Sequence, residues 1–301
     1  MEAPIIDDEL WTLIEPLLPP PKSKREEHPG RPRVPDRAAL NGILFVLKTG
    51  IRGEPFADPL GLWLGRDPLA ETERLAEGQR MGPTARIGTR QAARSRPARS
   101  LARGCRFLVG TSRWGERKTG PNPTDRARPG SKHHILVDAN CVPVSAILSG
   151  AHRNDVTQLL PLVDAVAPIR GSRGRPLQKP KVVYADRGYD SDPHRQRLRA
   201  RGIKPVIAKR RTEHGSGLGK FRWVVERTHS WLHNFRRLRI RFDRRADIHE
   251  AFLKLSCSLV CWNIFRRTDQ PFLNWPGGLK SEVQHSRHPV MSANGKENVP
   301  T

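Results

Sequence analysis

Apolar residues recur at helical spacing in the segment FRWVVERTHSWLHNFRRLRIR, which runs from Phe221 to Arg241. A period of 3.6 puts one set of them on a single face and predicts a long amphipathic helix: Phe221, Val224, Val225, Thr228, Trp231, Leu232, Phe235 and Leu238. Glu226 lies on the opposite face and is the only acid in this arginine-rich segment. Two explanations stay open for this residue. It is either a solvated carboxylate paired with an arginine, or a metal ligand beside arginines that hold phosphates.

Similar spacing predicts two helices near the N-terminus. Residues 7–18 place Leu10 and Ile14 on one face, and three prolines then end the helix. A second helix can begin at Asp36 and end at Gly50. Together these helices form either a small DNA-binding head or a helical cap on the main domain.

Strand and helix patterns alternate after Lys118. Residues 133–140 and 141–150 predict a hairpin, and Asp155 with Gln158 resembles a capping box at the start of a helix. The remaining elements, in chain order, are a buried strand over 182–185, a helix over 192–202, a strand over 203–208, the Glu226 helix and an apolar helix over 248–265. This order predicts an α/β domain with a mixed sheet.

The stretch from Arg52 to Arg113 shows no sustained period. It contains twelve arginines and no lysine, among glycine, proline, alanine and serine. A disordered basic linker is one explanation. The other is a segment read out of frame, because a GC-rich gene read in the wrong frame yields this composition. Both predict that residues 52–113 lack a packed fold.

The net charge of the chain indicates which class of partner it binds. The net charge is +24 and the pI is about 11.1, which favours a polyanion, nucleic acid before an anionic membrane. Residues 195–245 hold 17 of the basic residues against three acids. The four cysteines fit no zinc spacing, the N-terminus resembles no signal peptide, and no apolar run approaches about 18 residues. We therefore expect a cytoplasmic, nucleoid-associated protein without a membrane partner.

Asp186 is the second acid of interest, because it directly follows the predicted strand 182–185. Sites in open α/β sheets lie beyond the carboxyl ends of the strands. Asp186 is either a structural residue that caps the turn or pairs with Arg187, or a ligand of Mg²⁺ (or Mn²⁺) together with Glu226. In the second case a pair of ions can catalyse phosphodiester transfer. Arginines after the strand and along the helix would engage phosphates: Arg187, Arg222, Arg227, Arg236, Arg237, Arg239 and Arg241.

Five segments resemble bacterial insertion-sequence transposases of the DDE type, group five of the four/five superfamily. They are KTGPNPTDRARPGSKHHILVD, GAHRNDVTQLLPLVDAV, YADRGYDSD, RGIKPVIAKR and RWVVERTHSWLHNFRRLRIR, and the N-terminal helices resemble the helical head of the same group. The resemblance implies an RNase H-like domain with three acids. The second acid of the family corresponds to Asp186 and the third to Glu226. The place of the first acid is occupied by residues 104–116, which contain no Asp. Asp125 and Asp138 are the nearest acids, but neither fits the motif, and Asp138 is interpreted as a structural turn residue.

The resemblance divides the chain into four parts. Residues 1–51 are the helical head, 52–115 the irregular and frameshifted segment, 116–267 the catalytic domain and 268–301 a disordered tail. The implied function is binding of insertion-sequence ends and target DNA, by a homo-oligomer when active, with Mg²⁺-dependent cleavage and strand transfer. The missing first acid predicts impaired cleavage. A DNA-binding remnant without catalysis is the alternative, and an RNA-binding protein is a more distant one.

Overall fold

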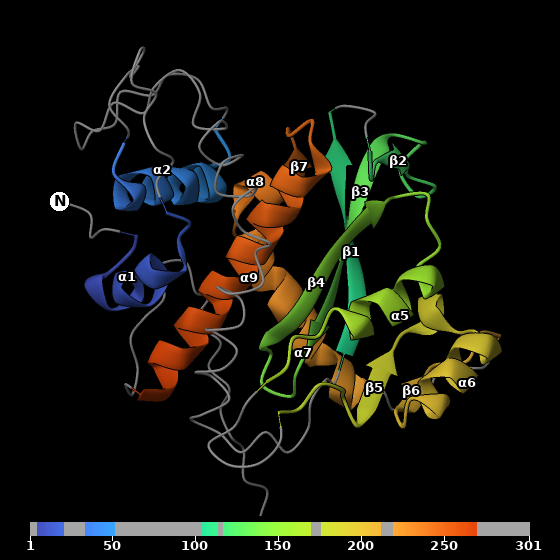
Figure 1. Ribbon diagram of the computed structural model, residues 1–301. Coiled ribbons are helices and arrows are strands. Elements are labelled where there is room, and N and C mark those ends of the chain that lie inside the picture. The colour runs from blue at the N-terminus through green and yellow to red at the C-terminus, as the bar shows by residue number, and fades with distance from the viewer. Residues whose placement is uncertain are drawn as a thin grey trace, which may run out of the picture.

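The computed structural model describes residues 5–20, 34–51, 104–113, 117–169, 176–211 and 219–269 (Figure 1). Its helices are α1 (Asp8–Ile14), α2 (Asp36–Thr49), α5 (Val156–Asp164), α6 (Asp192–Ala200), α7 (Gly219–His233), α8 (Arg236–Arg239) and α9 (Ala246–Asp269), with 3-10 turns η1 (Glu15–Leu17) and η2 (Arg187–Tyr189). Its strands are β1 (Gly104–Ser112), β2 (Gly120–Pro121), β3 (Pro129–Val137), β4 (Pro143–Gly150), β5 (Val182–Ala185), β6 (Lys204–Ile207) and β7 (Ile240–Arg241). The predicted order of strands and helices is confirmed from the hairpin β3–β4 to α7.

One mixed sheet forms the centre of the fold. The long strands lie in the order β4-β3-β1-β5-β6, with β2 beside β3 and β7 beside β1. The strands β4, β3 and β1 pair antiparallel, whereas β5 and β6 run parallel to β1. The predicted α/β class with a mixed sheet is therefore correct. No helix in the described part of the chain is long and apolar enough to cross a membrane.

The central strand β1 contradicts the expectation that residues 52–115 have no fold. Its residues 104–111 pair in continuous register with β3, and the matching residues of β3 are 130–137. Strand pairing uses main-chain groups, so it tolerates changes of side chain, and Phe107, Leu108 and Val109 favour a strand. The sequence analysis missed this short β-favouring run because arginines dominate the composition of the surrounding stretch. Within the proposed frameshift, residues 52–103 and 114–115 lie outside the described part.

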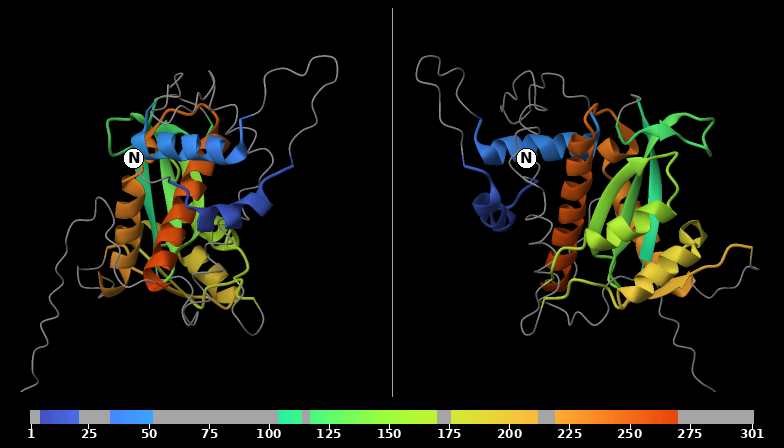
Figure 2. Two further views of the ribbon diagram at one scale, coloured as in Figure 1. Left: turned by 90° about the vertical axis from the view of Figure 1, so that its left-hand side faces the viewer. Right: turned by 45° about the vertical axis from the view of Figure 1, so that its right-hand side comes forward.

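Helices cover both faces of the sheet (Figures 1 and 2). On one face, α5 and α6 bury a core that includes Leu136, Val183 and Ala185. On the other face, α7 and α9 pack over Ile135 and Val137. The alternation of residues 135, 136 and 137 between the two cores is the period of two that a strand imposes.

The N-terminal helices belong to the same core as the main domain. Leu10 of α1 and Leu44 and Leu47 of α2 lie in one apolar cluster with residues of α7 and α9. The views agree that α9 lies between these helices and the sheet (Figures 1 and 2). The N-terminal helices therefore pack on the main domain as a cap, and DNA binding by them stays a prediction. Gly50, with φ 71°, ends α2 as predicted.

The predicted long helix over 221–241 is broken. The helix α7 ends at His233, where the amides of Asn234 and Phe235 bond to carbonyls three residues earlier and tighten the last turn. Phe235 is extended, and the short helix α8 follows in a new direction. Helical periodicity persists through the break because Leu238 is buried as well, so the pattern gave no warning of it.

Truncation of the α2 core tests whether the N-terminal helices fold with the main domain. Leu47 is fully buried, and Leu47→Ala should lower the free energy of unfolding by about 2–5 kcal/mol. Urea unfolding should show a single transition that shifts as a whole, because the cluster is shared. The exposed neighbour Lys48 supplies the control, and Lys48→Ala should change the midpoint little. A separate early transition in Leu47→Ala would show that the head unfolds alone.

Candidate active site and nucleic-acid interface

Asp186 lies directly after β5, at the carboxyl end of a strand in the middle of the sheet. Its backbone is extended, and its Oδ1 accepts a hydrogen bond from the amide of Gly188 at 3.0 Å. This bond begins the 3-10 turn η2 and orients the carboxylate, which is half-buried. The strand-end placement that the sequence predicted is therefore present.

A third acid, Asp155, lies across Gly188 from Asp186. A Cβ placed on Gly188 would be 3.1 Å from Asp186 Oδ1 and 3.3 Å from Asp155 Oδ2, so the two carboxylates are neighbours and Gly188 leaves them room. The other oxygen of Asp155 accepts from Lys132 Nζ at 2.9 Å. Burial raises the pKa of Asp155, although Lys132 opposes the shift.

The sequence predicted a helix start with a capping box at Asp155, and the helix does begin there, but the capping box does not form. Its side chain makes no capping bond, and Asn154 accepts from the amide of Val156 instead. The sequence did contain a signal for a site residue at this position. Asp155 lies between the end of β4 and the start of α5, and side chains in such connections lie at the edge of the sheet where sites form.

The loop that carries Asp186 is held by polar contacts on several sides. Tyr189 is buried, and its hydroxyl bonds to His134 Nδ1 at 3.1 Å. The other ring nitrogen of His134 bonds to Ser149 Oγ at 2.8 Å, and burial lowers the pKa of His134 to about 3. Arg210 donates to the carbonyls of Arg187 and Gly188. These contacts fix the turn and, with it, the direction of Asp186.

Glu226 lies on the exposed face of α7, as the sequence predicted. Val224 and Val225 pack into the core behind it, and Thr228 Oγ1 donates to the carbonyl of Cys141 at 2.9 Å. The helix crosses the sheet over β3, β1 and β5, the strand that Asp186 follows. The elements that carry the two acids are thus in contact. That both carboxylates face one cleft stays a prediction.

The seven arginines assigned to phosphates divide by burial. Arg227, Arg236 and Arg239 are exposed, and Arg187 is half-buried, whereas the side chain of Arg222 lies outside the described part. The predicted phosphate contact is wrong for two of the seven, because Arg237 and Arg241 are only 2% and 1% exposed. The guanidinium of Arg241 bonds inward to side-chain and main-chain oxygens, and the same holds for Arg237. Neither is available to DNA.

The buried arginines belong to a network that crosses the core. Arg237 Nη2 lies 2.7 Å from Asp243 Oδ1, and the second oxygen of Asp243 lies 3.2 Å from His249 Nδ1. His249 Nε2 is in turn 3.0 Å from His133 Nε2. The hydrogen bond from His249 and the charge of Arg237 lower the pKa of Asp243 despite its burial, so this carboxylate is ionised and only accepts. His249 therefore carries its proton on Nδ1, and His133 donates from Nε2.

The register of β1 shows which residue stands beside Asp186. Cys105 pairs with Ala185 in the parallel ladder, so the next position of β1, Arg106, neighbours Asp186. Arg106 also pairs with Ile135, which assigns position 106 to the face of the sheet that α7 covers. The position between the two acidic elements is thus occupied by a basic residue type.

Asp186 and Glu226 alone would supply ligands for one divalent ion at most. Two carboxylates with water complete the oxygen shell that Mg²⁺ prefers. A two-ion centre needs further anionic ligands, and within the described ranges no three His, Cys, Asp or Glu side chains group as a metal site. Asp138 is no substitute, since its Oδ1 accepts from the amides of Asn140 and Val142, which confirms its structural role.

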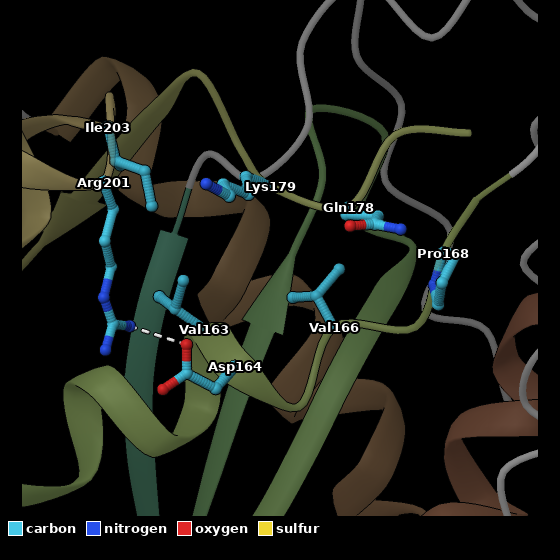
Figure 3. Close-up of a pocket in the computed structure, with 8 residues that line it drawn as sticks. All are labelled: Val163, Asp164, Val166, Pro168, Gln178, Lys179, Arg201 and Ile203. Atoms are coloured by element: carbon cyan, nitrogen blue, oxygen red, sulfur yellow. Dashed lines mark hydrogen bonds and ion pairs between the residues drawn. The ribbon is translucent and has the colours of Figure 1, made fainter. Parts of the chain in front are cut away.

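A pocket of about 320 Å³ lies at the opposite end of β5 from Asp186 (Figure 3). Its walls combine apolar with polar and charged side chains, and at its edge Arg201 pairs with Asp164 at 2.6 Å. Lys179 and Ile203 also line it, and both precede the parallel strands. It contains none of the predicted site residues.

Comparison with known families assigns the chain to a class. Residues 99–261 match the family described as the transposase DDE domain, and residues 6–54 match a family assigned as transposases of the IS4/5 family. The mixed sheet, the acid after β5 and the acid on the crossing helix agree with this result. The chain belongs to the family of DDE transposases, and the resemblance inferred from its motifs is confirmed.

Two relatives come from the insertion sequence element IS402 of Burkholderia cepacia. A protein assigned as the transposase of this element is 70% identical over 207 residues, which cover 69% of this chain and 98% of that protein. An uncharacterised 16.2 kDa protein of the same element is 65% identical over 65 residues, which cover 22% of this chain and 44% of that protein.

The buried histidines should make the fold unstable in acid. Burial lowers the pKa of His133, His134 and His249, so the folded protein keeps them neutral. The unfolded chain protonates them below about pH 6.5 and thus binds more protons. The free energy of unfolding should therefore fall from about pH 7 to pH 5, by up to about 1.4 kcal/mol per pH unit for each histidine.

Urea unfolding across this pH range measures the slope. His133→Gln removes one titrating group and should make the slope shallower. Equal stability at both ends of the range would contradict the neutral assignment.

Proposed function

We propose that this chain is a transposase that binds the ends of an insertion sequence and whose strand cleavage is impaired. Asp186 and Glu226 are the two acids that remain of a catalytic set on an RNase H-like domain. The strand order supports this assignment, with three antiparallel strands followed by two parallel ones. When bound to the two acids, one Mg²⁺ or Mn²⁺ would stabilise charge on a phosphate oxygen.

The observation that carries the proposal is the register of β1 against β5. Strand β1 pairs at Cys105 with the last residue of β5, which leaves Arg106 beside Asp186. A basic residue type at this position supplies no anionic ligand for a metal ion, whereas an acidic one would. Loss of an anionic ligand from a metal centre should cost several kcal/mol of transition-state stabilisation, and each 1.4 kcal/mol is tenfold in rate.

DNA binding should survive this defect, because it depends on other residues. Arg227, Arg236 and Arg239 are exposed along α7 and α8, and the net charge of the whole chain is +24. Guanidinium groups bind phosphates by paired hydrogen bonds, without need of the acids. The partner is double-stranded DNA, namely the terminal inverted repeats and a target, bound by a homo-oligomer when the protein is active.

A single substitution tests the proposed defect. Arg106→Asp should restore metal-dependent nicking of a supercoiled plasmid that carries matched insertion-sequence ends, whereas the unaltered chain should show none or orders of magnitude less. The matched control is Leu108→Asp, which pairs with His133 on the same face but two residues farther from Asp186. Glu226→Ala added to Arg106→Asp should abolish nicking again.

Two results would contradict the proposal. Efficient Mg²⁺-dependent nicking by the unaltered chain would show that another residue, with Asp155 the first candidate, completes the site. Equal nicking by Arg106→Asp and Leu108→Asp would show that position 106 has no special place. Tb³⁺ binding, read by energy transfer from tryptophan, should rise in Arg106→Asp and gives a readout independent of cleavage.

The salt dependence of DNA binding tests the arginine assignment. Each phosphate contact contributes about 0.9 to the slope of log affinity against log salt. Arg236→Ala and Arg239→Ala should each reduce the slope by about 0.9, measured by fluorescence anisotropy between about 50 and 200 mM salt. Arg199, exposed on α6, is the control, because α6 lies at the far side of the sheet from α8 (Figure 1). An unchanged slope in both α8 variants would remove them from the interface.

A further inference from the structure

Trp223 is unusually exposed for its size. Its exposed fraction is 47%, the largest among the bulky apolar side chains in the described part of the chain. Burial of an aromatic side chain stabilises a fold by about 1.5–3 kcal/mol, so an indole left in water is not explained by folding. It lies on α7 three residues before Glu226, which is one turn of helix, and both side chains are on the solvent side.

Arg227 contacts two tryptophan rings on this part of the helix surface. Its guanidinium carbon lies 5.7 Å from the ring centroid of Trp223 and 5.4 Å from that of Trp231. The three residues are spaced by four, so they form a row along α7. Both distances are within the range of cation–π attraction, which fixes the indole of Trp223 against a charged neighbour. The row combines a flat apolar ring with a cation.

That combination is what an unstacked nucleobase requires. A base has two apolar faces and hangs from a phosphate, so an indole can stack on the base while an arginine attracts the phosphate. A paired base inside a duplex offers no free face to this surface. A protein partner is less suited, because the surroundings are strongly basic, with Arg236 and Arg239 exposed farther along the same segment.

We propose that Trp223, held by Arg227, stacks an unpaired base of the DNA beside Glu226. The inference rests on the proposed function, since it takes DNA to be the ligand of this helix. The stacked base would fix the position of the strand relative to the acids. Trp223 is therefore a positioning residue for DNA and contacts no reacting atom.

Two duplexes of equal length and charge separate stacking from general attraction. One is fully paired, and the other carries an unpaired 2-aminopurine near one end. Base stacking on an aromatic side chain contributes about tenfold or more to affinity. Trp223→Ala should lose this factor for the unpaired duplex only, and Trp223→Phe should keep most of it. Ile240, 43% exposed in β7, provides the matched control Ile240→Ala, which should change neither affinity.

The fluorescence of 2-aminopurine gives an independent readout. It should be quenched when the unaltered chain binds, and should stay bright with Trp223→Ala at saturating protein. Binding of both duplexes with no effect of Trp223→Ala on either would overturn the stacking inference and leave the proposed function standing. An equal loss for both duplexes would also overturn it, because the indole would then contact paired DNA. No binding of either duplex by the unaltered chain would overturn both proposals.

Discussion

The buried ion pair between Arg237 and Asp243 ties together elements that are distant in the sequence. Arg237 also donates to the carbonyl of Ile51 at the end of the N-terminal helices, and its guanidinium lies over the ring of Phe252 in α9. The second oxygen of Asp243 holds His249, which reaches β3 through His133. Removal of one partner would leave an uncompensated buried charge, a cost of about 3–5 kcal/mol. The helices α8 and α9, the sheet and the N-terminal cap are therefore held in one arrangement.

This arrangement decides which arginines remain on the surface. The break between α7 and α8 turns the segment so that Arg237 points inward and its neighbours Arg236 and Arg239 stay in solvent. A continuous helix would instead have left Arg237 on the same face as Glu226. The basic character of the segment thus serves two purposes. Some of its charges hold the core, and others are free to attract a polyanion.

The candidate site shows a similar division between scaffold and chemistry. The turn that carries Asp186 is held by hydrogen bonds. The amide of Gly188 donates to Asp186, the hydroxyl of Tyr189 bonds to His134, and Arg210 donates to the carbonyl of Arg187. The central strand keeps its register against β3 and β5 although the residue beside Asp186 is an arginine. Main-chain pairing accepts almost any side chain, whereas a metal ligand must be one of a few types. The strand pairing of this fold therefore does not depend on which side chain stands at position 106.

The sequence by itself determined the alternation of strands and helices, the hairpin, the acid after β5, the exposed Glu226 and the family. Each of these depends on local periodicity, on turn residues or on motifs, which a single segment carries within itself. It did not reveal β1, whose few β-favouring residues are surrounded by arginine. Only the tertiary structure decided that Arg237 and Arg241 are buried, that Asp155 lies beside Asp186, and that position 106 of β1 neighbours Asp186. These facts depend on contacts between residues far apart in the chain, and burial, ion pairing and strand register exist only once those residues have met.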